Sequence, residues 1–146
     1  MIHVIGVPII VTTLLSLGMS YPLGEVTGCY CQAHIGLIGL VLALGLYIKL
    51  DLFSGLVSAA LYVGCYFLGN YLYLQNGDSH LKFVGLCQAA AWGGQFFGHW
   101  LEGRKPALMD NLLLTLAAPM FVVLEVLMVF GYKSHLHALI KDLKSE

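Results

Sequence analysis

Five long apolar runs, separated by short polar breaks, constrain the fold of this sequence more than any other feature. The runs cover residues 4–20, 33–50, 54–75, 83–101 and 111–131, and each is close to the ~20 residues that span the hydrocarbon core of a bilayer. Backbone groups inside a bilayer must be hydrogen-bonded within the chain, so such runs form helices rather than open strands. The sequence therefore predicts an all-α, polytopic membrane helical bundle that forms a single domain over residues 1–146.

The composition supports a membrane environment. Hydrophobic residues make up 59% of the chain and charged residues only 10%, whereas a soluble domain is roughly half apolar and a quarter charged. A soluble chain of this length could not cover so much apolar surface, so part of it is expected to face membrane lipid. The formal net charge of −1 gives no electrostatic basis for binding nucleic acid. The four cysteines lack the spacing of a zinc site and are predicted to be structural thiols.

The basic residues predict how the runs cross the membrane, because positive charge concentrates on the cytoplasmic side. With a cytoplasmic N-terminus and four transmembrane helices, Lys49, Arg104 and Lys105 all lie on the cytoplasmic side. The fifth run contains Pro119, and proline breaks a helix interior. We therefore expect a Pro-broken or re-entrant fifth segment, although a full fifth crossing stays open. Residues 132–146 are expected to form a short interfacial helix on the membrane surface.

The fourth run carries the polar side chains that point most clearly to chemistry. Successive steps of four, three, four and three residues place five of them on one helix face, namely Gln88, Trp92, Gln95, His99 and Glu102. Polar groups are costly in hydrocarbon, so this face is expected to point into the bundle. A ridge of small residues on the same run, Ala90, Gly94 and Gly98, is expected to let another helix approach closely.

Two histidines from distant runs are expected to meet at one face of the membrane. His3 begins the first crossing and His99 ends the fourth, so the predicted topology brings both to the same side. Imidazole is a ligand for iron, zinc and copper, and a neighbouring carboxylate or amide commonly orients it. The residues therefore indicate either a metal site or hydrogen bonds that only pack helices together, and both interpretations stay open at this point.

The remaining ionisable groups have simpler interpretations. Glu125 is costly in the middle of the fifth run. It is expected either to have a functional role or to hydrogen-bond Asn111, Thr115 or the backbone freed at Pro119. The other histidines lie near a membrane surface and are expected to be satisfied without a metal, namely His34, His80, His135 and His137. No phosphate-binding loop, dinucleotide fingerprint or nucleophile elbow occurs in the sequence.

Three segments carry longer and more specific patterns. They are Ile2–Pro8 (IHVIGVP), Gln95–Asn111 (QFFGHWLEGRKPALMDN) and Phe121–Val126 (FVVLEV). Together they resemble the 2-hydroxy fatty acid dioxygenase family over nearly the whole chain. The resemblance implies a multi-pass protein of the endoplasmic reticulum that acts in phytosphingosine breakdown. It also implies an enzyme that uses Fe(II) and O2 to shorten a 2-hydroxy fatty acid by one carbon, as in fatty acid alpha-oxidation.

The resemblance also implies roles for individual residues. His3 and His99 would be iron ligands, and four residues would orient these ligands or the substrate, namely Glu102, Gln95, Asp110 and Asn111. Family members usually carry a Tyr-His-x-Asn-Pro pattern shortly before the Ile-His motif, and this sequence lacks it. A third iron ligand is therefore not identified. An active dioxygenase, an inactive shortened isoform that keeps the fold, and a non-enzymatic membrane protein all remain open. Acyl-chain preference and oligomeric state are not indicated.

Overall fold

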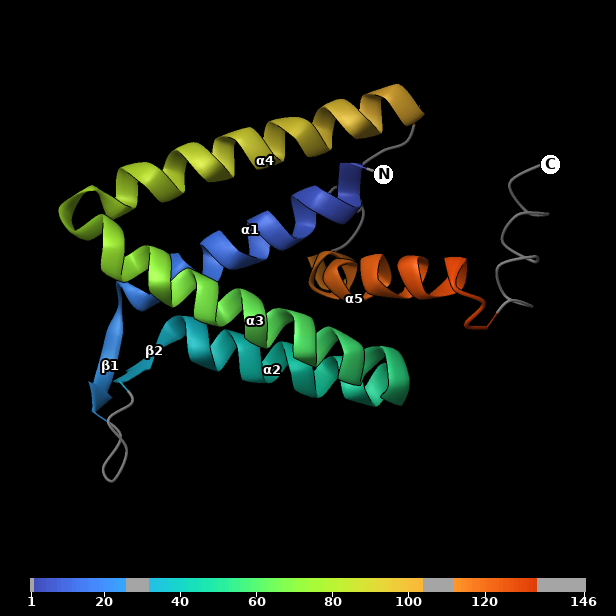
Figure 1. Cartoon of the computed structure of the whole chain (residues 1–146), viewed down its shortest axis with the longest axis horizontal. Coiled ribbons are helices and arrows are strands. Elements are labelled where there is room, and N and C mark those ends of the chain that lie inside the picture. The colour runs from blue at the N-terminus through green and yellow to red at the C-terminus, as the bar shows by residue number, and fades with distance from the viewer. Residues whose placement is uncertain (1, 26–31, 104–111, 134–146) are drawn as a thin grey trace.

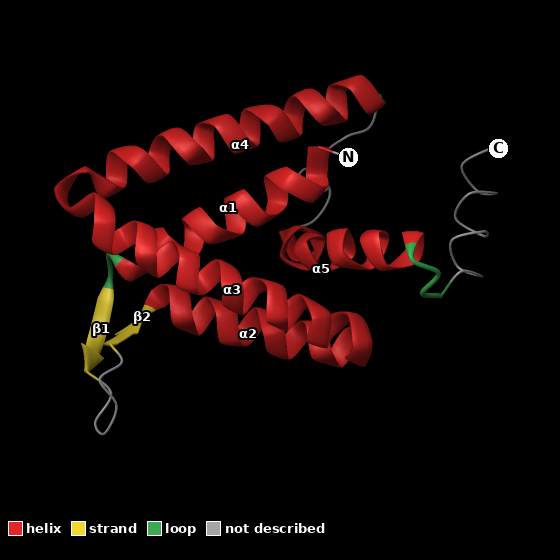
Figure 2. Ribbon diagram, viewed as in Figure 1, coloured by secondary structure: helices red, strands yellow, loops and turns green. Residues whose placement is uncertain are grey.

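The computed structural model describes residues 2–25, 32–103 and 112–133, which form a bundle of helices (Figures 1 and 2). The helices are α1 (Ile2–Met19), α2 (Ile35–Leu50), α3 (Leu52–Asn76), α4 (His80–Glu102) and α5 (Leu112–Val129), and the 3-10 turn η1 (Gly77–Ser79) joins α3 to α4. Each predicted apolar run corresponds to one of these helices, so the all-α architecture is confirmed. The interfacial helix predicted over 132–146 lies almost entirely outside the described residues.

A small antiparallel hairpin stands where the sequence predicts only a polar break. Strand β1 (Pro22–Glu25) pairs with β2 (Gln32–His34), with Pro22 opposite His34. Gly24 has a φ of 128°, a conformation that favours glycine because it has no Cβ. The hairpin leads directly into α2, because the ring of His34 accepts a hydrogen bond from the Leu37 N–H at 3.2 Å and caps the helix.

Helix α1 lies at the centre of the bundle, in contact with α2, α3, α4 and α5. Helix α4 runs antiparallel along it (Figure 1). Near the start of α4, the Nε2 atom of His80 lies 3.1 Å from the carbonyl oxygen of Ser16. Two turns further, Gln88 donates to the Ile10 carbonyl at 3.1 Å and to the Thr13 hydroxyl at 2.9 Å. The polar face of α4 therefore points toward α1, as predicted.

Glycines allow α1 to approach its neighbours, but not the glycines that the sequence indicates. A Cβ added to Gly18 would lie 2.5 Å from the Cα of Gly36, so α1 and α2 touch through their backbones. The predicted ridge on α4 is wrong for Ala90 and Gly94, whereas Gly98 at the end of the ridge is buried. Ala90 is exposed, and a Cβ added to Gly94 would meet no atom within 4 Å. The neighbouring helix α1 lies against the polar face of α4, where the buried hydrogen bonds are made, and leaves Ala90 and Gly94 facing outward.

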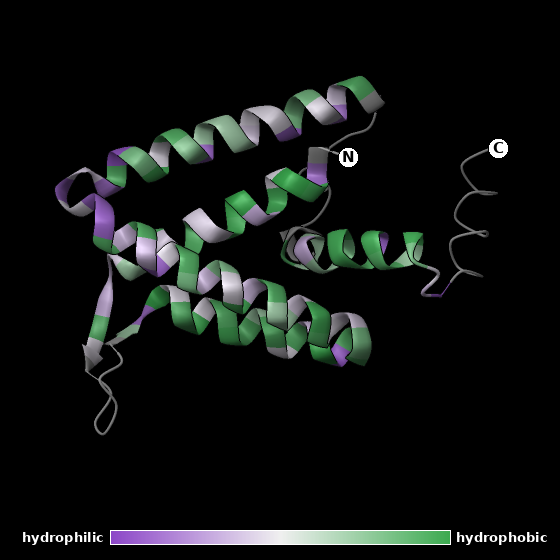
Figure 3. Cartoon of the chain, viewed as in Figure 1, coloured by the Kyte–Doolittle hydropathy of each residue, from purple (hydrophilic) through white to green (hydrophobic). Residues whose placement is uncertain are grey.

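The core is small and the outer surface is apolar. Buried side chains of α1, α2, α3 and α5 form one cluster, made of Leu15, Leu40, Tyr47, Tyr62, Cys65, Met120 and Val123. Many large hydrophobic side chains face outward, among them Leu86, Trp100 and Phe130, each more than 70% exposed, and hydrophobic positions recur along all of the described helices (Figure 3). One helical stretch in the described ranges, Leu52–Leu101, is long and apolar enough to cross a membrane. The number of crossings stays a prediction.

Helix α5 continues through Pro119, so the predicted break is wrong for its described backbone. Proline removes one backbone donor and pushes away a carbonyl of the preceding turn. Two tyrosines supply donors in this region. The hydroxyl of Tyr47 donates to the Leu116 carbonyl at 2.8 Å, and the hydroxyl of Tyr62 donates to the Pro119 carbonyl at 2.9 Å. These bonds supply donors to two carbonyls next to the proline and attach α5 to α2 and α3.

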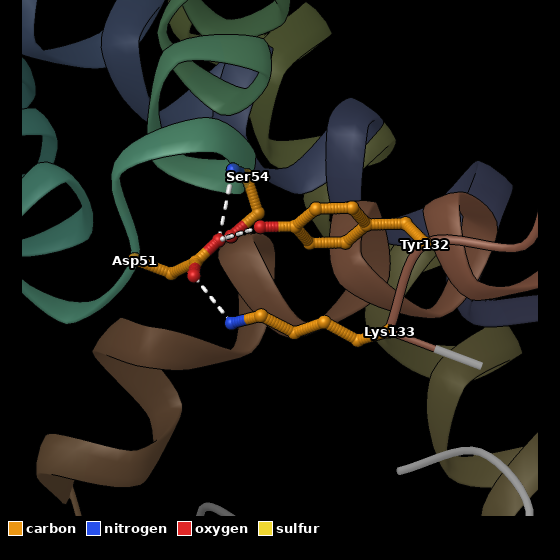
Figure 4. A network of polar contacts seen from close by, with 4 residues as sticks. All are labelled: Asp51, Ser54, Tyr132 and Lys133. Atoms are coloured by element: carbon orange, nitrogen blue, oxygen red, sulfur yellow. Dashed lines mark hydrogen bonds and ion pairs between the residues drawn. The ribbon is translucent and has the colours of Figure 1, made fainter. Parts of the chain in front are cut away.

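A polar network attaches the far end of α5 to the turn between α2 and α3 (Figure 4). The carboxylate of Asp51 caps α3 by accepting from the Ser54 N–H at 3.0 Å. It also accepts from the Tyr132 hydroxyl at 3.0 Å and forms an ion pair with Lys133. The hydrogen bonds from Lys133 and then Ser54 hold the pKa of Asp51 well below its ordinary value, and the same ion pair raises the pKa of Lys133.

Candidate functional site

A largely apolar cavity of about 670 Å³ lies among the helices, lined by side chains of α1, α2, α4 and α5 and by Tyr62 of α3. Near the start of α1 its lining is polar, with His3, Gln95 and His99. Toward the end of α1 the lining is apolar, with Leu14, Leu15 and Gly18 among its residues. A volume of a few hundred Å³ with polar groups gathered at one place is typical of a small-molecule site.

The polar end depends on a close approach of α1 and α4. A Cβ added to Gly6 would lie 2.5 Å from the amide nitrogen of Gln95, so only a glycine leaves room for that side chain. In this position the Oε1 atom of Gln95 is hydrogen-bonded to Nδ1 of His3. An amide oxygen only accepts, so Nδ1 of His3 is the donor in this bond.

His99 lies one helical turn beyond Gln95 and completes the polar end. The ring centroids of His3 and His99 are 4.5 Å apart, with the ring planes tilted by 40°. The predicted meeting of two imidazoles from distant parts of the chain is therefore confirmed. Their role as metal ligands stays a prediction.

The amide nitrogen of Gln95, like Nδ1 of His80, is a buried polar atom without a hydrogen-bond partner in the described residues. The Gln95 side chain is only 5% exposed. A buried donor without an acceptor costs ~1–3 kcal/mol, and a glutamine that served packing alone would be expected to satisfy both ends of its amide. The arrangement instead fixes the Oε1 atom on His3, which favours a functional role for this residue.

The other residues of the predicted site fall into two groups. Trp92 lines the cavity, and Glu125 lines it from α5 with an exposed side chain. The side chain of Glu102, and the whole of Asp110 and Asn111, lie outside the described residues. Their predicted roles stay predictions.

The described side chains fit an iron site in part. Two imidazoles at one end of a cavity, one of them hydrogen-bonded through Nδ1 to Gln95, are the nitrogen donors that Fe(II) accepts. Across residues 2–25, 32–103 and 112–133, no group of three His, Cys, Asp or Glu side chains could hold a metal. His3 and His99 would therefore supply two protein ligands, and the other donors are not among the described side chains.

Two further histidines have structural contacts instead. The Nδ1 atom of His34 accepts the hydrogen bond that caps α2, so the Nε2 atom carries the proton. This Nε2 atom lies 3.0 Å from the hydroxyl of Tyr66. His80 is buried against α1, with its Nε2 near the Ser16 carbonyl and its ring edge-on to Tyr73. The Nδ1 atom of His80 is buried without a hydrogen-bond partner in the described part of the chain, and the prediction that neither histidine binds a metal stays a prediction.

Sequence reasoning missed Gly6, Tyr47 and Tyr62, all of which shape the cavity. The Ile-His-x-x-Gly-Val-Pro motif contains Gly6 three residues after His3, so the motif itself held a signal for a close approach beside the histidine. Tyr47 and Tyr62 line the cavity and bond to α5. Neither tyrosine has a sequence signal, because their partner is the backbone of a distant helix.

Comparisons with known proteins gave one match. A family model described as 2-hydroxy-palmitic acid dioxygenase Mpo1-like matches residues 1–130. No curated protein and no solved structure matches the chain.

Proposed function

Because the chain belongs to the 2-hydroxy-palmitic acid dioxygenase Mpo1-like family, we propose that it is an Fe(II)-dependent enzyme that shortens 2-hydroxy fatty acids by one carbon. The overall change balances as a 2-hydroxy acid plus O2 giving the next shorter acid, CO2 and water. The bond between C1 and C2 breaks, C2 becomes the new carboxyl carbon, and the substrate supplies all the electrons that reduce O2.

The single observation that carries this proposal is the polarity of the cavity. The paired imidazoles and Gln95 lie near the start of α1, and most of the remaining lining is apolar, apart from Glu125 and two tyrosines. A 2-hydroxy fatty acid has the same division, with a carboxylate and a hydroxyl at one end and a long apolar tail. Its carboxylate and hydroxyl oxygens are hard donors, which suit Fe(II) beside two imidazoles.

The described residues then take specific roles. His3 and His99 would hold the iron, and Gln95 would keep His3 in the tautomer whose Nε2 can bind it. Bound iron would supply the activation of O2 and the polarisation of the substrate's oxygens. Glu102, Asp110 and Asn111 are proposed to orient the substrate.

We further propose that the protein is a multi-pass protein of the endoplasmic reticulum membrane, with α1 to α4 crossing the bilayer. The exposed apolar side chains on these helices support this arrangement. The stretch Leu52–Leu101 is 50 residues long, more than twice what one crossing needs, and η1 divides it into α3 and α4. A membrane location suits a substrate whose tail partitions into lipid.

The test uses the full chain, purified in detergent, with added Fe(II). Iron content is measured by mass spectrometry, and conversion of 2-hydroxypalmitate to the acid one carbon shorter is measured by gas chromatography. His99→Ala and His3→Ala are expected to lose both bound iron and product. His34→Asn is the matched control, because asparagine is also a good helix cap and His34 lies outside the cavity lining.

The result also separates the alternatives. The wild type could bind no iron, with product measurements that neither histidine substitution changes. That result would support a packing role for the histidines and a non-enzymatic protein. Iron that binds without turnover would support a form that keeps the site and lacks activity.

A further inference from the structure

The cavity has a defined length along α1. Residues from His3 to Gly18 line it from one face of the helix, and these fifteen residue steps cover about 22 Å at ~1.5 Å per residue. An acyl chain in one leaflet occupies about half of the ~30 Å hydrocarbon core, or about 15 Å. The cavity is therefore long enough for one such chain together with its polar head.

The end of the cavity away from the histidines lies where α1 and α2 meet. Gly18 and Gly36 both line it. A Cβ on Gly36 would lie 2.6 Å from the Leu15 carbonyl oxygen, so the two backbones leave no room for a side chain between them. An acyl chain that starts at the histidines would meet this contact between backbones at its methyl end.

Helix α2 leaves space just before that contact. Gly39 is one turn beyond Gly36, lines the cavity and is exposed, and a Cβ added to it would meet no atom within 4 Å. Ala43 continues the same small face one turn further on. Unlike Gly18 and Gly36, Gly39 is not required by close packing, because nothing adjoins it. The space beside it is available to a ligand.

We propose that Gly39 sets the longest acyl chain that the cavity accepts, with the tail of the 2-hydroxy acid lying along α1 and its methyl end beside Gly39. This inference rests on the proposed function, which places the polar head of the substrate at His3 and His99. The buried Gln95 amide nitrogen, which lacks an acceptor in the described residues, supports a polar ligand group at that end. A large side chain at position 39 would occupy the space of the terminal methylenes.

The expected effect is a change in chain-length preference rather than a general loss. Excluding two methylenes would lower the ratio of kcat/KM for 2-hydroxypalmitate to kcat/KM for 2-hydroxydecanoate by about 15-fold, at ~0.8 kcal/mol per buried methylene. Gly39→Phe is expected to show this shift, and Gly39→Leu a smaller one. Activity on the shorter acid is expected to stay within about two-fold, because its chain does not reach the substituted position.

Gly45→Phe is the matched control. Gly45 lies on the same helix, is exposed, has no atom within 4 Å of an added Cβ, and does not line the cavity. It is expected to keep the wild-type preference. Identical chain-length profiles for Gly39→Phe and Gly45→Phe would overturn the proposal, and would indicate that the tail leaves the cavity sideways into the bilayer.

A second measurement does not depend on turnover. Thermal unfolding of each purified protein is followed with and without each 2-hydroxy acid, because a ligand that binds the folded state raises Tm. We expect 2-hydroxypalmitate to stabilise the wild type and Gly45→Phe but not Gly39→Phe, and 2-hydroxydecanoate to stabilise all three. If the acids stabilise the variants according to chain length but no product forms, the role of Gly39 is upheld and the proposed reaction is refuted. If product forms but Gly39→Phe does not change the chain-length preference, the proposed reaction is upheld and the role of Gly39 is refuted.

Discussion

Replacing Gly6 with alanine tests whether the tautomer of His3 matters for the site. The new Cβ would lie 2.5 Å from the Nε2 atom and 3.1 Å from the Cδ atom of Gln95. Carbon contacts are optimal at about 3.5–4.0 Å, so the amide of Gln95 must move by about 1 Å. A shift of that size breaks or badly distorts its hydrogen bond to His3.

The expected loss falls on the site more than on the fold. Removing a group that orients a metal-binding histidine typically lowers metal affinity or activity about 10- to 100-fold. Overpacking lowers the free energy of unfolding by ~1–3 kcal/mol, and the lower value applies here because the displaced atom is the tip of a flexible side chain. The higher helix propensity of alanine offsets this loss by up to ~1 kcal/mol. Tm is therefore expected to change by only about 2–4 °C, while kcat/KM for 2-hydroxypalmitate and Fe(II) affinity both fall.

The assay compares Gly6→Ala with Gly85→Ala, an exposed glycine on α4 whose added Cβ meets no atom within 4 Å. The control is expected to keep full activity and equal or higher stability. A double-variant cycle then adds Gly6→Ala to Gln95→Ala. If Gly6 acts through Gln95, the second change has no further effect on activity. Equal losses in both backgrounds, or no loss in the wild-type background, would refute the reasoning.

Two predictions concern stability. Tyr62→Phe removes the donor to the Pro119 carbonyl and is expected to lower the free energy of unfolding by about 1 kcal/mol, measured by thermal unfolding in detergent against the exposed control Tyr71→Phe. Asp51→Asn removes the ion pair with Lys133 while keeping a capping side chain. A carboxyl with a lowered pKa stabilises the fold above its ordinary pKa, and this contribution is lost as the pH falls through the lowered value. The contribution of Lys133, whose pKa is raised, is present below the ordinary lysine pKa and is lost as the pH rises through the raised value. The difference in Tm between wild type and Asp51→Asn should therefore be constant between about pH 5 and 9 and shrink on further acidification; a difference that grows in acid would contradict the assigned sign.

The sequence predicts the helices well, because each apolar run has the length and the polar ends of a single helix. The spacing from Gln88 to His99 predicts one polar face on α4, because helical periodicity is a local property. The expected topology places His3 and His99 at the same side, but their contact depends on the packing of α1 against α4.

The features that the sequence does not predict depend on contacts between distant segments. The Ala90 and Gly94 ridge has the spacing of a packing face, yet α1 lies against the polar face instead. Pro119 has the chemistry of a helix break, yet α5 continues through it, and two tyrosines from other helices donate to carbonyls beside it. A local sequence pattern indicates which structures a segment can form. Which of them it adopts depends on the helices that pack against it.

The antiparallel contact of α1 and α4 has one further consequence, which concerns the alignment of the two histidines. His80 and Gln88 bond to fixed positions on α1, at Ser16 and at Ile10 and Thr13. Sliding α4 by one turn would move it about 5.4 Å and separate each of these groups from its hydrogen-bond partner on α1. The hydrogen bonds far from the cavity's polar end therefore determine the spacing between the imidazoles, and substitutions at His80 or Gln88 would act on that spacing from a distance.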